Sequence, residues 1–251
     1  MARLAFGVDV GGTGIKAGLV DLRRGRLRGE RIRMETPAGG EPEAIAAAVR
    51  SMLENSGQDW LHLPIGICLP SVVVAGVTKS AANVSKRWLG LDAQELFQTA
   101  LGSRVALLND ADAAGLAEVR FGAALGVRGT VLVVTLGTGI GTALFHNGRL
   151  VPNLELGHIE IDGKDAESEA SFAAKERAGL SFADWARRLE RYFLTLEKLV
   201  SPGLIIVGGG VSKQHSEFLP LLKLNTPIVP AQHRNSAGII GAAARAAQRK
   251  S

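Results

Sequence analysis

The chain has 251 residues, of which 46% are hydrophobic and 21% charged, and it carries a formal net charge of +5. This composition excludes a disordered chain, and no apolar run is long enough to cross a bilayer. Cys68 is the only cysteine, which excludes an intramolecular disulfide and a metal site built from several cysteines. Because the N-terminus enters an apolar run at Leu4 without a secretory leader pattern, we expect a cytoplasmic protein with no membrane partner.

The first half of the chain begins with an apolar strand over residues 4–10 and a glycine turn over Gly11–Gly14. Strands are predicted over 15–21 and 27–34, joined by an Arg-Arg-Gly hairpin turn. The patterns that follow predict a helix over 41–53, strands over 63–69 and 72–79, a helix over 92–101, a strand over 105–108 and a helix over 111–121.

The second half repeats this pattern, with a strand over 130–136, a glycine-threonine turn and a return strand over 141–146. A long helix opens at Ser181 and ends before Pro202; it is followed by a strand over 204–207, a turn over 208–210, a strand over 228–230 and a helix over 236–248. The repetition predicts two α/β lobes related by duplication that meet across a cleft. We expect one lobe to comprise residues 1–108 and 237–251, and the other residues 109–236.

Both glycine turns suit a phosphate, because glycine lets backbone N–H groups approach its oxygens and threonine adds a hydroxyl donor. Lys16 can add a cation, and Asp9 suits a hydrated Mg²⁺. Either turn alone is equally typical of a structural hairpin, and neither has the Walker A or dinucleotide spacing. The predicted phosphate-binding residues are Asp9, Gly11, Gly12, Thr13, Gly14, Lys16, Thr135, Gly137, Thr138 and Gly139.

Two further stretches carry polar side chains suited to an alcohol substrate. Asn109 and Asp110 stand where a strand gives way to a helix, so Asp110 is a candidate base for a hydroxyl, although Asp110 and Asp112 would also suit a helix cap. Glu155 and His158 lie three residues apart and could bind sugar hydroxyls, although such pairs are also common on surfaces.

Taken together, these motifs resemble the ROK family of sugar kinases and repressors. The matching phrases are D-x-G-G-T-x-I-K at 9–16, L-x-N-D-A-x-A-A at 107–114 and E-x-G-H-x-x-x-D at 155–162. The resemblance implies an actin-like ATPase (ribonuclease H-like) α/β fold with two lobes and a central cleft, and a homodimer. It further implies that Asp110 is the catalytic base and that sugar hydroxyls are held by Asn83, Asn109, Asp110, Glu155 and His158.

The chain departs from the family after the E-x-G-H phrase. Most members carry C-x-C-G-x-x-G-C-x-E there, whose cysteines bind zinc together with the histidine, whereas residues 161–171 contain no cysteine. No zinc is therefore expected. Alignment on the final glutamate makes Glu169 the expected sugar carboxylate, with Glu167 as the fallback.

This cysteine-free version resembles one branch of the family, the polyphosphate glucokinases, in the phrases A-A-N-V-S-K-R-W-L-G at 81–90, S-F-A-D-W-A at 181–186 and V-G-G-G-V-S-K-Q at 207–214. The resemblance implies transfer of a phosphoryl group from inorganic polyphosphate, and also from ATP, to the 6-hydroxyl of glucose, with Mg²⁺. An ATP-only hexose kinase for glucose or mannose remains an alternative, because an adenine could pack on Gly208, Gly209 and Gly210 in either case. A non-catalytic sugar or polyanion sensor is disfavoured by the intact Asn109–Asp110 pair, and no nucleic-acid partner is expected, since no helix-turn-helix precedes Leu4.

The basic surplus favours a polyanionic partner, since polyphosphate is a line of negative charge. Six arginines fall between residues 23 and 33, a block that would equally suit the solvated rim of a hairpin. Other residues could guide polyphosphate, although each alone also suits a solvated surface: Lys16, Lys79, Lys86, Arg87, Arg187, Arg188, Arg191 and Lys213.

Overall fold

The computed structural model describes residues 3–248 and divides the chain into two compact units. Unit 1 comprises Met1–Ala117 and Ser236–Ser251, and unit 2 comprises Glu118–Asn235. The sequence placed the boundary between residues 108 and 109, in front of the helix α3 (Asp110–Phe121), whereas the compact units divide inside this helix.

Unit 1 is built on a sheet with the strand order β3-β2-β1-β5-β8, and β4 also pairs with β2. Its strands are β1 (Leu4–Val10), β2 (Gly14–Asp21), β3 (Arg26–Leu27), β4 (Ile32–Glu35), β5 (Ile65–Leu69) and β8 (Val105–Asn109). β1 and β2 form an antiparallel hairpin, while β1, β5 and β8 run parallel, which suits the fully buried apolar run of β5. The single strand predicted over 27–34 is wrong, because Gly29 takes a φ of 91° and ends the extended chain between β3 and β4.

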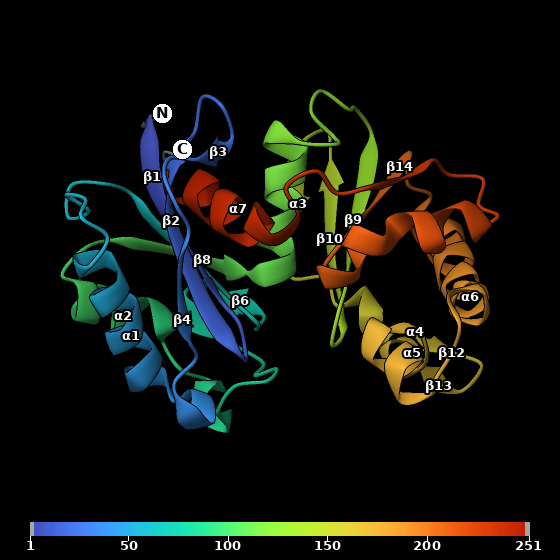
Figure 1. Cartoon of the computed structure of the whole chain (residues 1–251), viewed down its shortest axis with the longest axis horizontal. Helices are drawn as coiled ribbons and strands as arrows, with labels where there is room; N and C mark the ends of the chain where they lie inside the picture. The colour runs from blue at the N-terminus through green and yellow to red at the C-terminus, as the bar shows by residue number, and fades with distance from the viewer. Residues whose placement is uncertain (1–2, 249–251) are drawn as a thin grey trace. The chain divides into compact units, whose positions relative to one another are not determined.

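Helices cover the sheet of unit 1. The apolar faces of α1 (Pro42–Glu54) and α2 (Ala93–Leu101) join the main core through Ile45, Val49 and Phe97. The C-terminal helix α7 (Ala237–Ala246), red in Figure 1, lies against the strands β1 and β5. A Cβ atom on Gly66 of β5 would lie 1.8 Å from the carbonyl oxygen of Ala242, so only glycine permits this approach.

One loop of unit 1 also differs from the sequence prediction. The strand expected over 72–79 is a small hairpin of β6 (Val73–Val74) and β7 (Val77–Thr78), turning at Ala75 and Gly76, which have φ values of 50° and 85°. Short 3₁₀ helices, η1 (Ala38–Gly40) and η2 (Lys86–Trp88), complete this unit. The indole of Trp88 joins them by donating to the Gly40 oxygen over 2.9 Å.

Unit 2 repeats the plan of the first sheet with the order β11-β10-β9-β14-β15. Its strands are β9 (Thr130–Leu136), β10 (Ile140–His146), β11 (Arg149–Val151), β14 (Leu204–Gly208) and β15 (Ile228–Pro230). An antiparallel hairpin of β9 and β10 again adjoins parallel strands, β14 and β15. The duplication that the repeated motifs predict is therefore present in the topology of the two sheets.

The long helix α6 (Phe182–Val200), orange in Figure 1, begins at Ser181, whose hydroxyl accepts from the Asp184 amide over 3.1 Å. Its apolar face buries Trp185 and Leu189, and the Trp185 indole donates to the Ala170 oxygen over 2.9 Å. This bond ties α6 to a segment for which the sequence patterns predicted no element. That segment contains η3 (Leu156–His158), β12 (Glu160–Ile161), β13 (Lys164–Asp165), α4 (Ala166–Ala170) and α5 (Phe172–Arg177).

The remaining elements are the 3₁₀ helices η4 (Gly210–Glu217), η5 (Leu219–Leu221) and η6 (Arg234–Ser236). None of the helices within residues 3–248 is both long enough and apolar enough to span a membrane.

Candidate active site

The first glycine turn joins β1 to β2 in unit 1. The Gly11 amide donates to the Gly14 oxygen over 3.1 Å, and the Thr36 hydroxyl donates to the Gly11 oxygen over 2.5 Å. A Cβ atom on Gly12 would lie 2.7 Å from Cβ of Asn83, so the turn touches the loop that carries this residue. The structure thus brings Asn83, a predicted sugar residue, to the predicted phosphate turn.

The carboxylate of Asp9 lies beside this turn. Its Oδ2 forms an ion pair of 3.0 Å with Nζ of Lys16, and its Oδ1 accepts a weak bond from Sγ of Cys68 at 3.7 Å. Burial raises the pKa of the Cys68 thiol well above its usual value, and the charges of Asp9 and Asp110 raise it further. Asp9 and Asp110 therefore act on the same buried thiol, at the carboxyl end of the parallel strands, where α/β sheets bind their ligands.

Asn109 caps the helix α3. Its Oδ1 accepts from the amides of Ala111 and Asp112 over 2.8 and 3.1 Å, and its Nδ2 donates to the Ser71 oxygen over 3.3 Å. The half-buried Asp110 lies at the junction of β8 and α3, and its Oδ1 accepts from the Ala111 amide over 2.8 Å. Asn109 therefore caps α3 through two amides, and Asp110 shares one of them, the Ala111 amide, so the alternative of a cap for Asp110 is met in part.

The second glycine turn joins β9 to β10 in unit 2. The Gly137 amide donates to the Gly139 oxygen over 3.0 Å, and the Ala173 amide of α5 donates to the Gly137 oxygen, also over 3.0 Å. Oε2 of Glu167 accepts from the Ile140 amide over 2.7 Å and would lie 2.3 Å from a Cβ atom on Gly139. The helices α4 and α5 thus both form hydrogen bonds to this turn. Thr138, in the middle of the turn, is exposed.

The glycine run after β14 lies beside the same turn. Gly208 pairs with Thr135, and a Cβ atom on Gly209 would lie 2.2 Å from the Leu136 oxygen. The Ser212 hydroxyl donates to the Gly209 oxygen over 2.7 Å, and Ser212 also lines a pocket of about 350 Å³. The other residues that line this pocket are His215, Pro230, Ala231, Gln232 and Arg234.

The sugar residues predicted in unit 2 are placed by β10 and by Asp165. The buried Thr142 hydroxyl donates to the Leu154 oxygen over 2.6 Å and accepts from the Leu156 amide over 3.0 Å, which fixes the backbone on either side of Glu155. Nδ1 of His158 lies 2.9 Å from Oδ2 of Asp165, and this hydrogen bond raises the pKa of the imidazole. Oδ1 of Asp165 also caps α4, accepting from the Ser168 amide over 3.0 Å.

The two candidate carboxylates of α4 have different surroundings. Loss of hydration raises the pKa of the Glu155 carboxyl, with Glu167 adding to the rise and His158 opposing it; Glu167 also raises the pKa of His158. Glu167 therefore belongs to one electrostatic cluster with Glu155 and His158. Glu169 instead forms ion pairs of 3.3 Å with Lys164 and with Arg188. The position expected to bind sugar, Glu169, is engaged with cations, and the fallback, Glu167, lies at the turn.

Several of the cations proposed to guide polyphosphate are neutralised by local partners. Arg87 pairs with Glu41 at 3.0 Å and with Glu43 at 2.6 Å, and Arg191 pairs with Asp162 at 2.9 Å. Arg187 pairs with Asp184, and Arg188 with Glu169. Lys79, Lys86 and Lys213 make no ion pair with any residue of the described range 3–248.

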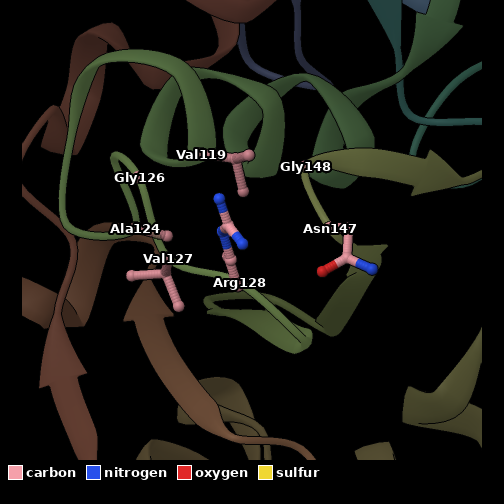
Figure 2. Close-up of a pocket in the computed structure, with 7 residues that line it drawn as sticks. All are labelled: Val119, Ala124, Gly126, Val127, Arg128, Asn147 and Gly148. Carbon is pink, nitrogen blue, oxygen red and sulfur yellow. The ribbon is translucent and has the colours of Figure 1, made fainter.

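A second pocket, of about 460 Å³, lies away from the predicted site (Figure 2). Figure 2 shows the side chain of Arg128 extending into it, between Val119 on α3 and Asn147 on the turn after β10. Because β9 begins at Thr130 and the glycine turn follows its last residue, Leu136, this pocket lies at the opposite end of the β9–β10 hairpin. It contains none of the predicted site residues.

Two sheets of one plan, each with a glycine turn after its first strand, define the actin-like ATPase fold of the ROK sugar kinases. The chain belongs to the ROK family, whose sequence pattern matches residues 5–176. It is 46% identical over 242 residues to the polyphosphate glucokinase of Mycobacterium tuberculosis, and this aligned region covers 96% of this chain and 90% of that protein.

Solved structures agree with this assignment. The inorganic polyphosphate/ATP-glucomannokinase from Arthrobacter sp. strain KM superposes with a TM-score of 0.93 at 53% identity, covering 98% of this chain and 99% of that one. A ROK family glucokinase from Streptomyces griseus, in complex with glucose and AMPPNP, superposes with a TM-score of 0.81 at 26% identity, covering 96% and 98%. The resemblance inferred from the sequence motifs is confirmed.

Proposed function

We propose that the chain is a polyphosphate glucokinase, which transfers a phosphoryl group from inorganic polyphosphate to the 6-hydroxyl of glucose and gives glucose 6-phosphate. The similarity to the Mycobacterium tuberculosis polyphosphate glucokinase over 96% of the chain carries the proposal. The likeness to the Arthrobacter polyphosphate/ATP-glucomannokinase supports both donors and leaves mannose as a further acceptor.

In this proposal Asp110 is the general base that accepts the proton of the attacking hydroxyl. Its support is its place at the carboxyl end of β8, where Asn109 accepts from two amides of α3 and Asp110 accepts through Oδ1 from one of them. In each turn one amide, that of Gly11 or Gly137, is used in the backbone bond that closes the turn. The remaining amides of residues 11–14 and 137–139 bind phosphate oxygens and stabilise the charge that develops during transfer.

On the sugar side, we assign the remaining carboxylate to Glu167 in place of Glu169. Glu167 acts electrostatically on Glu155 and His158, whereas both carboxylate oxygens of Glu169 are committed to Lys164 and Arg188. Glu155, His158 and Glu167 then offer acceptors and donors to vicinal hydroxyls. Asn83 and Asn109 stay predicted sugar residues.

A divalent metal is expected in a kinase of this kind, and we propose Mg²⁺ near Asp9. Mg²⁺ binds through one or two carboxylates plus waters and substrate phosphates, which the single carboxylate of Asp9 beside a phosphate turn fits. Residues 3–248 contain no group of three or more His, Cys, Asp or Glu that could form a complete cage. The ion would neutralise charge on the phosphates when bound.

ATP as a second donor has its own structural support. The pocket of about 350 Å³ begins at Ser212, directly after Gly208–Gly210 and beside the second turn. A nucleoside placed there would leave its phosphates next to Gly137–Gly139. Initial rates with glucose and either long-chain polyphosphate or ATP separate a dual-donor enzyme from the ATP-only alternative.

A homodimer and a cytoplasmic location stay predictions. The homodimer can be checked by sedimentation.

The test of the proposed mechanism is Asp110→Asn. This change keeps the size of the side chain and removes its basicity, so kcat should fall by at least roughly a hundredfold while glucose still binds. Steady-state kinetics with both donors and calorimetric titration with glucose measure these effects. Turnover near that of the wild type would exclude Asp110 as the base, and absence of product with every donor in the wild type would support the sensor alternative.

A further inference from the structure

The open edge of the sheet in unit 1 carries cations that the proposed mechanism does not use. β3 and β4 both pair with the outer edge of β2, and in Figure 1 β4 lies beside it. Ile32 and Met34 pack against the core, so Arg33 between them takes the other face of the strand, by the alternation of a strand. The side chain of Arg33 is exposed.

The strand register sets Arg33 in one row with the residues of the first turn. Asp9 on β1 pairs with Lys16 on β2, and Lys16 pairs with Arg33 on β4. Nε and Nη2 of Arg33 would lie 3.5 and 3.8 Å from a Cβ atom on Gly14, so the guanidinium lies against the last residue of the turn. An anion that leaves Gly11–Gly14 along this edge therefore meets Lys16 and then Arg33.

The charges in this row are not balanced. Lys16 is paired with Asp9 at 3.0 Å, whereas the guanidinium of Arg33 makes no hydrogen bond or ion pair with any residue from 3 to 248. Lys16 and Arg33 lie directly opposite each other on two strands, where like charges repel, and the single carboxylate of Asp9 balances only one of them. Glu35, the acidic residue on the same face, pairs in register with Gly14 and forms no ion pair with Arg33.

We propose that Lys16 and Arg33, continued by the exposed Arg31 that precedes β4, form a binding strip for linear polyphosphate. The strip holds the part of the chain beyond the phosphoryl group that is transferred. This inference rests on the proposed polyphosphate donor and extends its site outward from the first turn. It distinguishes the donors, because the proposed nucleoside site holds ATP beside Gly137–Gly139, whereas polyphosphate has no nucleoside and can follow this edge.

The experiment compares Arg33→Ala with Arg24→Ala, a matched loss of one exposed arginine from the turn between β2 and β3. Arg33→Ala should raise KM for long-chain polyphosphate roughly tenfold, with KM for ATP and for glucose within about twofold of the wild type. The dependence of log(kcat/KM) for polyphosphate on log salt should become shallower by about one. Arg24→Ala should change none of these values by more than about twofold. Retained ATP-dependent turnover shows that both variants are folded.

The proposal is overturned if Arg33→Ala leaves KM for long-chain polyphosphate within about twofold of the wild type, or raises KM for ATP by the same factor. Direct binding of fluorescently labelled polyphosphate keeps the test separate from the proposed function. If the wild type binds polyphosphate but does not transfer from it, the donor assignment is wrong, and weaker binding by Arg33→Ala still supports the strip. Equal binding by the variant and the wild type overturns it.

Discussion

Individual side chains decide how the predicted motifs function, and adjacent residues divide the roles. Asn109 caps α3 with its amide oxygen, and its neighbour Asp110 is the proposed general base. On α4, Glu167 accepts from the Ile140 amide, while Glu169, two residues on, pairs with Lys164 and Arg188. The sequence could identify both pairs of candidate residues. It could not show which member of each pair has which role, because that depends on the direction in which each side chain leaves the backbone.

The choice between the two glutamates is testable with isosteric amides. Glu167→Gln removes the charge from the cluster with Glu155 and His158 and weakens the bond that holds the second turn, because charge-assisted hydrogen bonds are roughly twice as strong as neutral ones. KM for glucose should rise roughly tenfold or more, together with a lower kcat. Glu169→Gln should change either constant by no more than about twofold, since its ion pairs are exposed. A larger effect of Glu169→Gln on the glucose KM would restore the original assignment.

Whole elements followed the sequence patterns where those patterns were long. The strands β1 and β9 and the helix α6 lie where apolar periodicity placed them. Prediction failed where a positive φ interrupts an apolar run: Gly29 separates β3 from β4, and Ala75, which is no turn signal, opens the hairpin of β6 and β7. The helices α4 and α5, of five and six residues, are too short to show a helical period, and the N-cap residues Asp165 and Ser171 were the sequence signals for them.

The close packing of α7 on the strand β5 predicts how a substitution at Gly66 affects stability. A methyl group at position 66 would lie 1.8 Å from the backbone oxygen of Ala242, and a backbone atom cannot turn away as a side chain can. Gly66→Ala should therefore reduce the free energy of unfolding by about 1–3 kcal/mol. Gly203→Ala is the control, because its Cβ would meet only the Thr130 oxygen at an ordinary 3.6 Å, and it should change stability by less than about 1 kcal/mol. Urea unfolding followed by circular dichroism measures both, and equal midpoints would mean that α7 shifts at little cost.

At the scale of the whole molecule, duplication and charge were readable from the sequence. The two glycine turns predicted two sheets of one plan, and both sheets are present. The net charge of +5 predicted a polyanionic partner, but the sequence could not identify the cations that remain available for binding. Four of the proposed guides are paired with carboxylates: Arg187 pairs with Asp184 in its own helix, whereas Arg87, Arg188 and Arg191 pair with residues distant in the chain.

The excess positive charge makes the choice of donor depend on ionic strength. A polyphosphate chain contacts several cations at once, and each contact that displaces a counterion adds roughly 0.7–0.9 to the slope of log affinity against log salt. Between about 50 and 200 mM salt, kcat/KM for long-chain polyphosphate should therefore fall roughly tenfold or more, and kcat/KM for ATP should fall less, because ATP makes fewer such contacts. Initial rates at limiting donor and saturating glucose, measured across a salt series, give both slopes. Equal slopes for the two donors would mean that polyphosphate is held only where ATP is held, through the transferred group and the turns, and that the basic surface of this molecule plays no part in selecting the donor.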